Sequence, residues 1–193
     1  SSNTEELKNI TIKIDTKAPI TTFSSSLNVT TGWYTSVINI TLSASDELSG
    51  IDKIYYKIDG RNYTEYSEPI KLGEGIYNFV FFAVDIAGNA EKPHRKEIKI
   101  DYTPPSISIK NPLNGIYIFG RKILTTQETV IIGGITIEAD CVDNLAGIKR
   151  VEFYIDGVYK ANITSSPYKY VWDEFAIGYH EIKVIAYDKA GNY

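Results

Sequence analysis

The chain is poor in the residues that serve metal, redox and acid–base chemistry. Among its 193 residues it has one cysteine, two histidines and no methionine. A lone cysteine, Cys141, excludes an intrachain disulfide and a zinc site built from several cysteines, and at a strand end it is read as a packing residue. His94 and His180 lie in no metal-ligand or nucleophile motif, and no glycine-rich phosphate loop is present. The sequence therefore predicts a protein that is not an enzyme.

Long apolar runs and an excess of basic residues are also missing. The longest apolar stretch, Phe79 to Val84, is far shorter than the roughly 18 residues needed to cross a bilayer. The net charge is −4, with 20 Lys and Arg against 24 Asp and Glu. Such a surface lacks the basic field that supplies most nucleic-acid affinity. No direct membrane span and no nucleic-acid partner are predicted.

The residues that are abundant favour β-strands. Fifteen tyrosines accompany many Ile, Val and Thr, whereas apolar residues do not recur at helical spacing over a useful length. Apolar and polar positions instead alternate, as at Ile38, Ile40 and Leu42, and Gly, Asp, Asn and Pro clusters separate the alternating runs. The pattern predicts short strands of an antiparallel sandwich.

Two tandem repeats are visible in the sequence. The run Asp46 to Ile51, followed by Ile58-Asp59-Gly60, matches Asp143 to Ile148, followed by Ile155-Asp156-Gly157, 97 positions later. Further on, Ala83 to Asn89 matches Ala186 to Asn192, 103 positions later, and both contain Asp-x-Ala-Gly-Asn. The Asp-Gly pairs tolerate the positive φ angles of a tight hairpin.

These turns, with the junction Ile100 to Pro105, resemble the Ig-like, fibronectin-III-like repeats of bacterial and archaeal cell-surface proteins. The resemblance implies an all-β fold of two tandem Ig-like sandwiches. We expect Ig-like domain 1 at residues 18–102 and Ig-like domain 2 at 103–193. Residues 1–17 would be an orphan N-terminal strand that belongs to a preceding domain or is donated to a neighbouring subunit.

The two repeats are predicted to end differently. The first continues into a last strand at Lys96 to Asp101, whereas the second stops one residue after Asn192 and lacks that strand. The opening segment matches the first repeat's last strand 86 positions later, so Ile12 and Ile14 correspond to Ile98 and Ile100. We expect domain 2 to have an open groove, and strand 8–15 to fill such a groove with Ile10, Ile12 and Ile14 pointing inward.

Two functions follow from these ends. In one, strand 8–15 passes into domain 2 of a neighbouring copy, a head-to-tail contact that builds a filament and resembles donor-strand complementation in pili and archaeal threads. In the other, the chain is an excerpt of a covalent Ig-repeat stalk of an adhesin or surface-layer protein, with adjacent repeats or glycans on a host surface as partners. Both predict a non-catalytic, extracellular structural protein.

Five Asn-x-Thr sequons indicate N-glycosylation, although Asn and Thr are also common on exposed strands. At least two of them, at Asn9 and Asn39, fall on the polar face of their predicted strands. Glycosylation would place the protein outside the cell and on its surface or a surface filament. The five acceptor residues are Asn9, Asn28, Asn39, Asn62 and Asn162.

Carboxylates gather in the loops that an Ig-like strand order brings to one pole of each sandwich. Oxygen ligands of this kind hold Ca²⁺, but aspartates in turns also cap free backbone amides, and no loop has dense calcium-ligand spacing. No other cofactor is predicted. The candidate calcium ligands are Asp46, Glu47 and Asp85 in the first repeat and Asp140, Asp143 and Asp188, with Asn144, in the second.

Two further features have less definite interpretations. Residues 116–134 have no counterpart in the first repeat and predict an extra hairpin of Ile116–Ile123 with Val130–Ile132. Six aromatic residues could form a surface for sugars or a protein, or could pack on strand faces. These are Tyr55, Tyr63, Tyr66, Tyr168, Tyr170 and Trp172.

Overall fold

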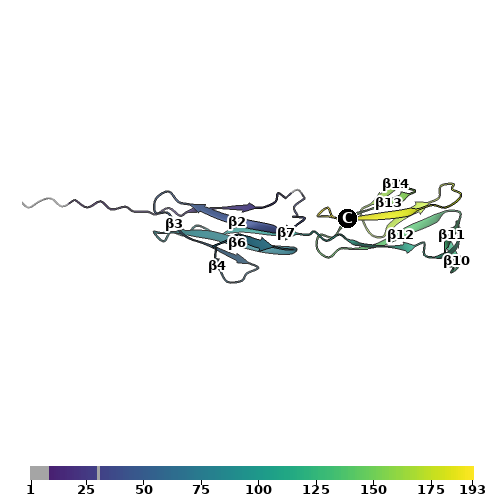
Figure 1. The fold of residues 1–193 in the computed structure, drawn as a ribbon, viewed down its shortest axis with the longest axis horizontal. Coiled ribbons are helices and arrows are strands. Elements are labelled where there is room, and N and C mark those ends of the chain that lie inside the picture. The colour runs from purple at the N-terminus through teal and green to yellow at the C-terminus, as the bar shows by residue number, and fades with distance from the viewer. Residues whose placement is uncertain (1–8, 30) are drawn as a thin grey trace, which may run out of the picture. The chain divides into compact units, whose positions relative to one another are not determined.

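The computed structural model describes residues 9–29 and 31–193, which form sixteen strands and no helix (Figure 1). The all-β fold class is thus confirmed, and the described residues contain no helix that could cross a membrane. Contacts divide the chain into two compact units. The first unit comprises residues up to Ser26, Asn39–Lys71 and Tyr77–Ile98, and the second comprises Leu27–Ile38, Leu72–Ile76 and Lys99–Tyr193. The domain boundaries at 17/18 and 102/103 remain predictions.

Strands β1 to β7 form two sheets that pack through apolar side chains. Alternate residues of β2, Ile38, Ile40 and Leu42, are buried, as the period of two in the sequence predicts. The ring centroids of Phe23 on β1 and Phe79 on β6 lie 6.0 Å apart, which joins the two sheets. One sheet has the order β1(Ile20–Ser25), β2(Ile38–Ser45), β5(Ile70–Leu72), and the other β4(Thr64–Glu65), β3(Ile51–Ile58), β6(Gly75–Asp85), β7(His94–Ile100).

The second repeat forms a matching pair of sheets, one of which has three strands where its counterpart has four. Its core consists of eight buried residues, among them Ile137 on β12 and Phe153 on β13. One sheet has the order β15(Tyr168–Trp172), β12(Ile135–Val142), β8(Ser106–Asn111), and the other β14(Val158–Ile163), β13(Ile148–Ile155), β16(Ile182–Asp188). Strand β6 lies between β3 and β7, whereas its counterpart β16 pairs only with β13 among the described residues.

Both predicted Asp-Gly hairpin turns are present. Asp59 and Gly60 have φ angles of 52° and 72°, and Asp156 and Gly157 have 51° and 76°. Two successive positive φ angles define the hairpin turn that matches the twist of antiparallel strands. The turns connect β3 to β4 and β13 to β14, as the sequence predicted.

The segment without a counterpart differs from its prediction. Strand β9(Gly115–Ile118) pairs antiparallel with β10(Arg121–Leu124), so the hairpin covers the range predicted to be its first arm and one more residue at each end. Strand β11(Thr129–Ile132) then pairs with β9 in parallel. The predicted hairpin of Ile116–Ile123 with Val130–Ile132 is wrong, because the chain already reverses at Phe119 and Gly120, which have positive φ angles of 46° and 76°.

The N-terminal segment forms no strand in the described part of the chain. Residues 9–19 carry no regular secondary structure, and Ile10, Ile12 and Ile14 are 86%, 70% and 73% exposed. A strand needs a neighbour for its backbone hydrogen bonds, and no described segment lies beside this one as a ladder partner. Lys8, the first residue of the predicted donor strand, and Thr30, in the sequon of Asn28, lie outside the described residues.

Candidate functional sites

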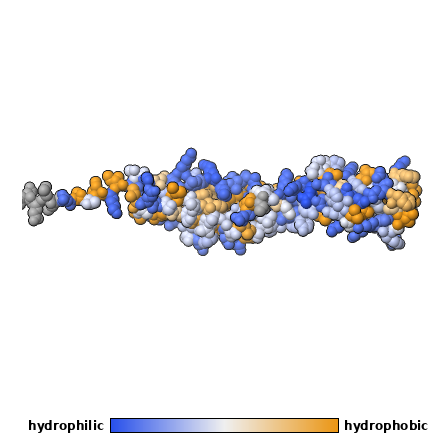
Figure 2. Space-filling view, turned by 90° about the horizontal axis from the view of Figure 1, so that it is seen from above, coloured by the Kyte–Doolittle hydropathy of each residue, from blue (hydrophilic) through white to orange (hydrophobic). Residues whose placement is uncertain are grey.

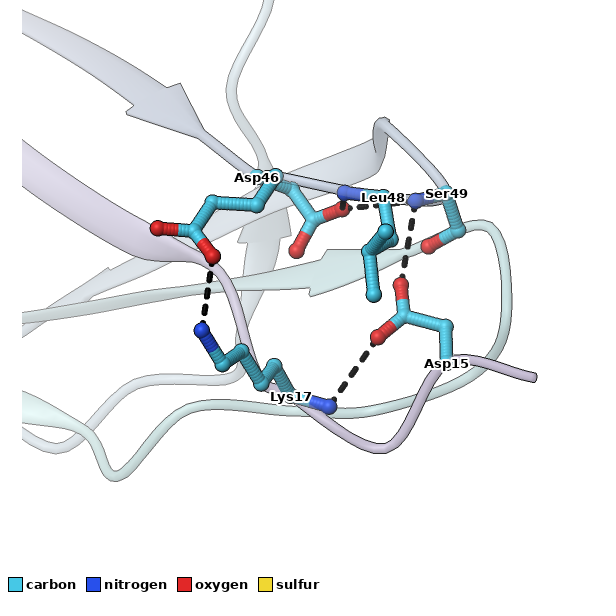
Figure 3. Close-up of polar contacts among 6 residues, drawn as sticks. Asp15, Lys17, Asp46, Leu48 and Ser49 are labelled. Atoms are coloured by element: carbon cyan, nitrogen blue, oxygen red, sulfur yellow. Dashed lines mark hydrogen bonds and ion pairs between the residues drawn. The ribbon is translucent and has the colours of Figure 1, made fainter. Parts of the chain in front are cut away.

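The first repeat holds a group of three carboxylates, Asp15, Asp46 and Asp85, which we call the first aspartate group. Asp46 follows β2, and its Oδ2 accepts the backbone N–H groups of Leu48, Ser49 and Gly50 at 2.9, 2.8 and 3.0 Å. Asp15 accepts the same Ser49 N–H at 3.0 Å through Oδ2, and the Lys17 N–H through Oδ1 (Figure 3). The loop 46–50 is therefore anchored by two aspartates from separate segments.

Asp85, at the end of β6, completes this group and is 1% exposed. Its Oδ1 accepts the Asn89 backbone N–H at 2.7 Å, and its Oδ2 accepts the Asn89 side-chain amide at 2.8 Å. The same amide donates to the Asp15 backbone carbonyl at 3.3 Å. The Asp-x-Ala-Gly-Asn turn thus connects the end of β6 to the segment that precedes β1.

The second repeat reproduces these contacts in the second aspartate group, Asp101, Asp143 and Asp188. Asp143 accepts the N–H groups of Leu145 and Gly147, and Asp101 accepts that of Ala146 at 2.9 Å. Asp188 accepts the N–H and side-chain amide of Asn192, at 2.8 and 2.7 Å. That amide again donates to a carbonyl, here of Asp101 at 3.0 Å.

Burial and backbone donors shift the pKa values of Asp101 and Asp46 in opposite directions. Burial raises the pKa of Asp101, and the nearby charges of Asp143 and Asp188 add to this, while the Ala146 and Thr103 N–H groups oppose it. The N–H groups of Gly50 and Leu48 lower the pKa of Asp46. Each donor stabilises the ionised form, whereas a buried carboxylate beside like charges favours its proton.

The structure brings four of the six predicted carboxylate ligands into these groups and leaves two outside. Asp46, Asp85, Asp143 and Asp188 belong to them, but the Glu47 carboxylate pairs with Lys17 Nζ at 2.6 Å. Asp140 is exposed on β12, because its neighbours Ala139 and Cys141 take the inward-facing positions. Asn144, the predicted amide ligand, is exposed. Asp15 and Asp101 were not predicted as ligands.

The donor set of each group fits a hard cation such as calcium. Each residue offers a carboxylate oxygen, and the three oxygens lie within 4.8 Å of one another. The hydrogen bonds described above also fit the alternative, in which the aspartates cap turn amides. Calcium binding therefore stays a prediction from the sequence, with capping as its competitor.

Adding calcium is expected to raise the melting temperature by about 10 °C at a concentration near 100 times Kd, because binding to the folded state alone stabilises it. Scanning calorimetry with calcium and then with a chelator tests this. The rise should shrink from about pH 7 to about pH 4, because protons compete for Asp101, whose pKa is raised. A melting temperature that is the same in calcium and chelator would leave capping as the whole role of both groups.

The predicted glycosylation sites are accessible. Asn9, Asn28, Asn39, Asn62 and Asn162 are all exposed. Accessibility is necessary for an acceptor and is also expected of any polar strand residue. Glycosylation therefore stays a prediction.

Most of the predicted surface aromatics pack on strands. Tyr55 stacks on Phe82 with ring centroids 5.4 Å apart, and Tyr63, the most exposed member of the set at 42%, meets the same Phe82 edge-on at 5.1 Å. Tyr66, Tyr168, Tyr170 and Trp172 are half-buried. The arrangement favours packing over a flat stacking surface.

Cys141 and the two histidines have local structural partners. Cys141 packs against the second core, and burial raises the pKa of its thiol to about 11. His94 Nε2 lies 2.9 Å from Glu91, and His180 Nδ1 lies 2.7 Å from Asp156. A thiol with a raised pKa is a poor nucleophile, so Cys141 behaves as the predicted packing residue.

Comparison with known proteins identifies the type of repeat. Residues 105–184 match the family model of the bacterial Ig domain. The second repeat is therefore similar to the bacterial Ig domain. The predicted resemblance is thus confirmed, and Ig-like repeats of this kind are typically extracellular or surface-associated, structural or adhesin-like, and generally non-catalytic.

Solved structures with Ig-like or fibronectin-like domains are also similar. The fibronectin(III)-like modules of Clostridium thermocellum CbhA share 21% identity over 90% of this chain and 88% of that chain, with a TM-score of 0.41. The central fibronectin-III array of RIM-binding protein shares 11% identity over 88% of this chain and 57% of that chain, with a TM-score of 0.29. No curated protein matches the chain.

Proposed function

We propose that the chain is an extracellular structural protein of a cell surface or surface filament, whose copies join head to tail. In this proposal residues 8–15 of one copy form a strand beside β16 of the next copy. The observation that carries it is the difference between two equivalent strands. Strand β6 has a neighbour on each side, and β16 has one only, among the described residues.

The first repeat serves as the template for the contact. Strand β7 lies beside β6 and buries Ile98 and Ile100, which are 1% and 0% exposed. Ile12 and Ile14 stand 86 positions earlier in matching sequence, and they are 70% and 73% exposed. Burying both side chains would contribute about 3–6 kcal/mol.

The register of the template also refines the predicted inward residues. Ile10 corresponds to Lys96, whose Nζ lies 4.7 Å from the centroid of the Phe23 ring rather than in the core. Ile12 and Ile14 are therefore the two anchors in this proposal, and Ile10 occupies the position nearer the edge. The paired backbone supplies the remaining stabilisation through ladder hydrogen bonds.

The double variant Ile12→Asp with Ile14→Asp is expected to abolish head-to-tail association, because two carboxylates cannot enter an apolar groove unpaired. Sedimentation velocity over a range of concentrations should show oligomers of increasing mass for the original chain and monomers for the variant. The control is Asn9→Asp with Thr11→Asp, which adds the same charge to the opposite face of the strand and should associate as the original does.

Two results would contradict the strand exchange. One is a double variant that associates as well as the original chain. The other is an original chain that stays monomeric at all concentrations, which would favour the covalent stalk, in which a neighbouring repeat of the same polypeptide supplies the strand.

A further inference from the structure

The end of the second unit that carries β10 and β11 has an unusually apolar surface. Figure 1 shows these strands at the end opposite the C-terminus, and Figure 2 shows apolar surface gathered there. We define the end patch as six exposed apolar side chains from the β9–β10 hairpin and the loop that follows β15. They are Phe119 (78% exposed), Ile123 (60%), Leu124 (58%), Phe175 (92%), Ile177 (82%) and Tyr179, which is fully exposed.

Phe119 occupies a position that local structure disfavours. It is the first residue of the hairpin turn and has a φ angle of 46°, where the two other hairpins place Asp59 and Asp156. A bulky side chain at positive φ is strained, and such strain is typical of functional positions. An exposed aromatic ring at the tip of a strained turn therefore points to a contact made outside this unit.

The corresponding end of the first repeat is built differently. Its described residues include no counterpart of β9, β10 and β11. Ile177 matches Glu74, whose carboxylate accepts the N–H of Tyr102 at 3.0 Å. The end patch is thus specific to the second repeat.

A second exposed apolar surface lies at the end of the first unit where the chain enters it, which we call its N-terminal pole. A cleft of about 650 Å³ lies there, lined by Leu48, Ile86 and Ala87, by Glu47 and Ser49, and by residues 13–15 of the N-terminal segment. Strand exchange would withdraw Ile14 from this cleft and leave Leu48 and Ile86 as its large apolar side chains. Leu48 and Ile86 are 62% and 69% exposed. Their counterparts in the second repeat are Leu145, which is 37% exposed, and Lys189.

The strand exchange would bring these two surfaces together. Ala90 bridges Val84 in an antiparallel sense, so β7 starts beside the Asp85 end of β6 and runs back along it. A donated strand in the same direction would leave β16 at Ile182. Ile182 pairs with Ile155, directly before the turn at the end-patch end of the unit. The donor's Asp15, which contacts Ser49 in the cleft wall, would emerge there.

We propose that the end patch of one copy docks against the N-terminal cleft of the next copy, with Phe119 and Ile177 facing Leu48 and Ile86. This inference rests on the proposed strand exchange and adds a second contact to it. The apolar surfaces occur at the two ends that meet between copies. The residues equivalent to Ile177 and Ile86 are Glu74 and Lys189. They lie at the other ends of the repeats and are charged.

The variants Phe119→Asn and Ile86→Lys test the docking. Each is expected to weaken association about 10- to 100-fold in sedimentation equilibrium, because the contact then buries one large apolar side chain fewer. Asn tolerates positive φ, so Phe119→Asn should leave the monomer's melting temperature unchanged or higher. Val142→Asn, at a valine that is 60% exposed near the opposite end of the same unit, is the control and should associate normally.

The outcomes separate this inference from the proposed function. If Phe119→Asn and Ile86→Lys associate like the original chain while Ile12→Asp with Ile14→Asp is monomeric, the docking is wrong and the strand exchange stands. If the original chain does not associate, both are wrong. Docking is supported if both single variants weaken association and the combined variant loses less than the sum of the two, because the two residues then share one contact.

Discussion

Replacing Phe153 with alanine is expected to lower the free energy of unfolding by about 3–5 kcal/mol. The side chain is fully buried in the centre of β13 and packs 6.1 Å from the ring of Tyr170. Its removal leaves a cavity among residues of both sheets, including Ile137 and Ala186. Urea denaturation followed by circular dichroism would measure the loss.

The control for this prediction is the same substitution at Phe175. This side chain is 92% exposed, so Phe175→Ala should change the free energy of unfolding by roughly 0.5 kcal/mol or less. Both variants are best measured with Ile12→Asp and Ile14→Asp present, so that association does not contribute. Equal effects at the two positions would mean that Phe153 does not occupy the core.

Replacing Asp188 with alanine is expected to lower the free energy of unfolding by about 2–4 kcal/mol. The carboxylate accepts three hydrogen bonds, from the N–H groups of Gly191 and Asn192 and from the Asn192 side chain. Its loss leaves these donors without their acceptor at a fully buried position. Relief of repulsion with Asp101 and Asp143 offsets part of the cost.

Thermal unfolding in a chelator measures the capping role of Asp188 alone, without any calcium. Asp188→Asn keeps one carbonyl acceptor and should lose less than Asp188→Ala. Asp140→Ala removes an exposed carboxylate of the same unit and should have little effect. If Asp140→Ala and Asp188→Ala were equally destabilising, the hydrogen-bonded turn would not explain the role of Asp188.

The fold could be predicted from the sequence because its signals are local. Alternation at Ile38, Ile40 and Leu42 reflects a strand with one buried face, and the Asp-Gly pairs mark turns that need positive φ. The Phe119-Gly120 turn was missed because the prediction depends on such local signals. A phenylalanine is not expected at positive φ, so nothing in the local sequence marks a reversal there.

Only two of the three members of each aspartate group could be predicted, because each group takes one member from a distant segment. Asp15 and Asp101 follow apolar alternation and read as strand ends, and only their shared spacing of 86 residues indicates a common role. Asp140 could have been excluded from the pattern, since Ala139 and Cys141 flank it on the inward face. Glu47 could not have been excluded from the sequence, because its pairing with Lys17 depends on the path of the chain before β1.

Asp101 follows the last strand of the first repeat directly, yet its carboxylate holds the Ala146 loop of the second. The matched family segment begins at residue 105, after this aspartate. A second repeat that is transferred to another protein by cutting at Pro104-Pro105 would therefore lose Asp101, which holds its own loop. A transplantable module should start upstream of the aspartate, at the expense of carrying part of its predecessor's strand.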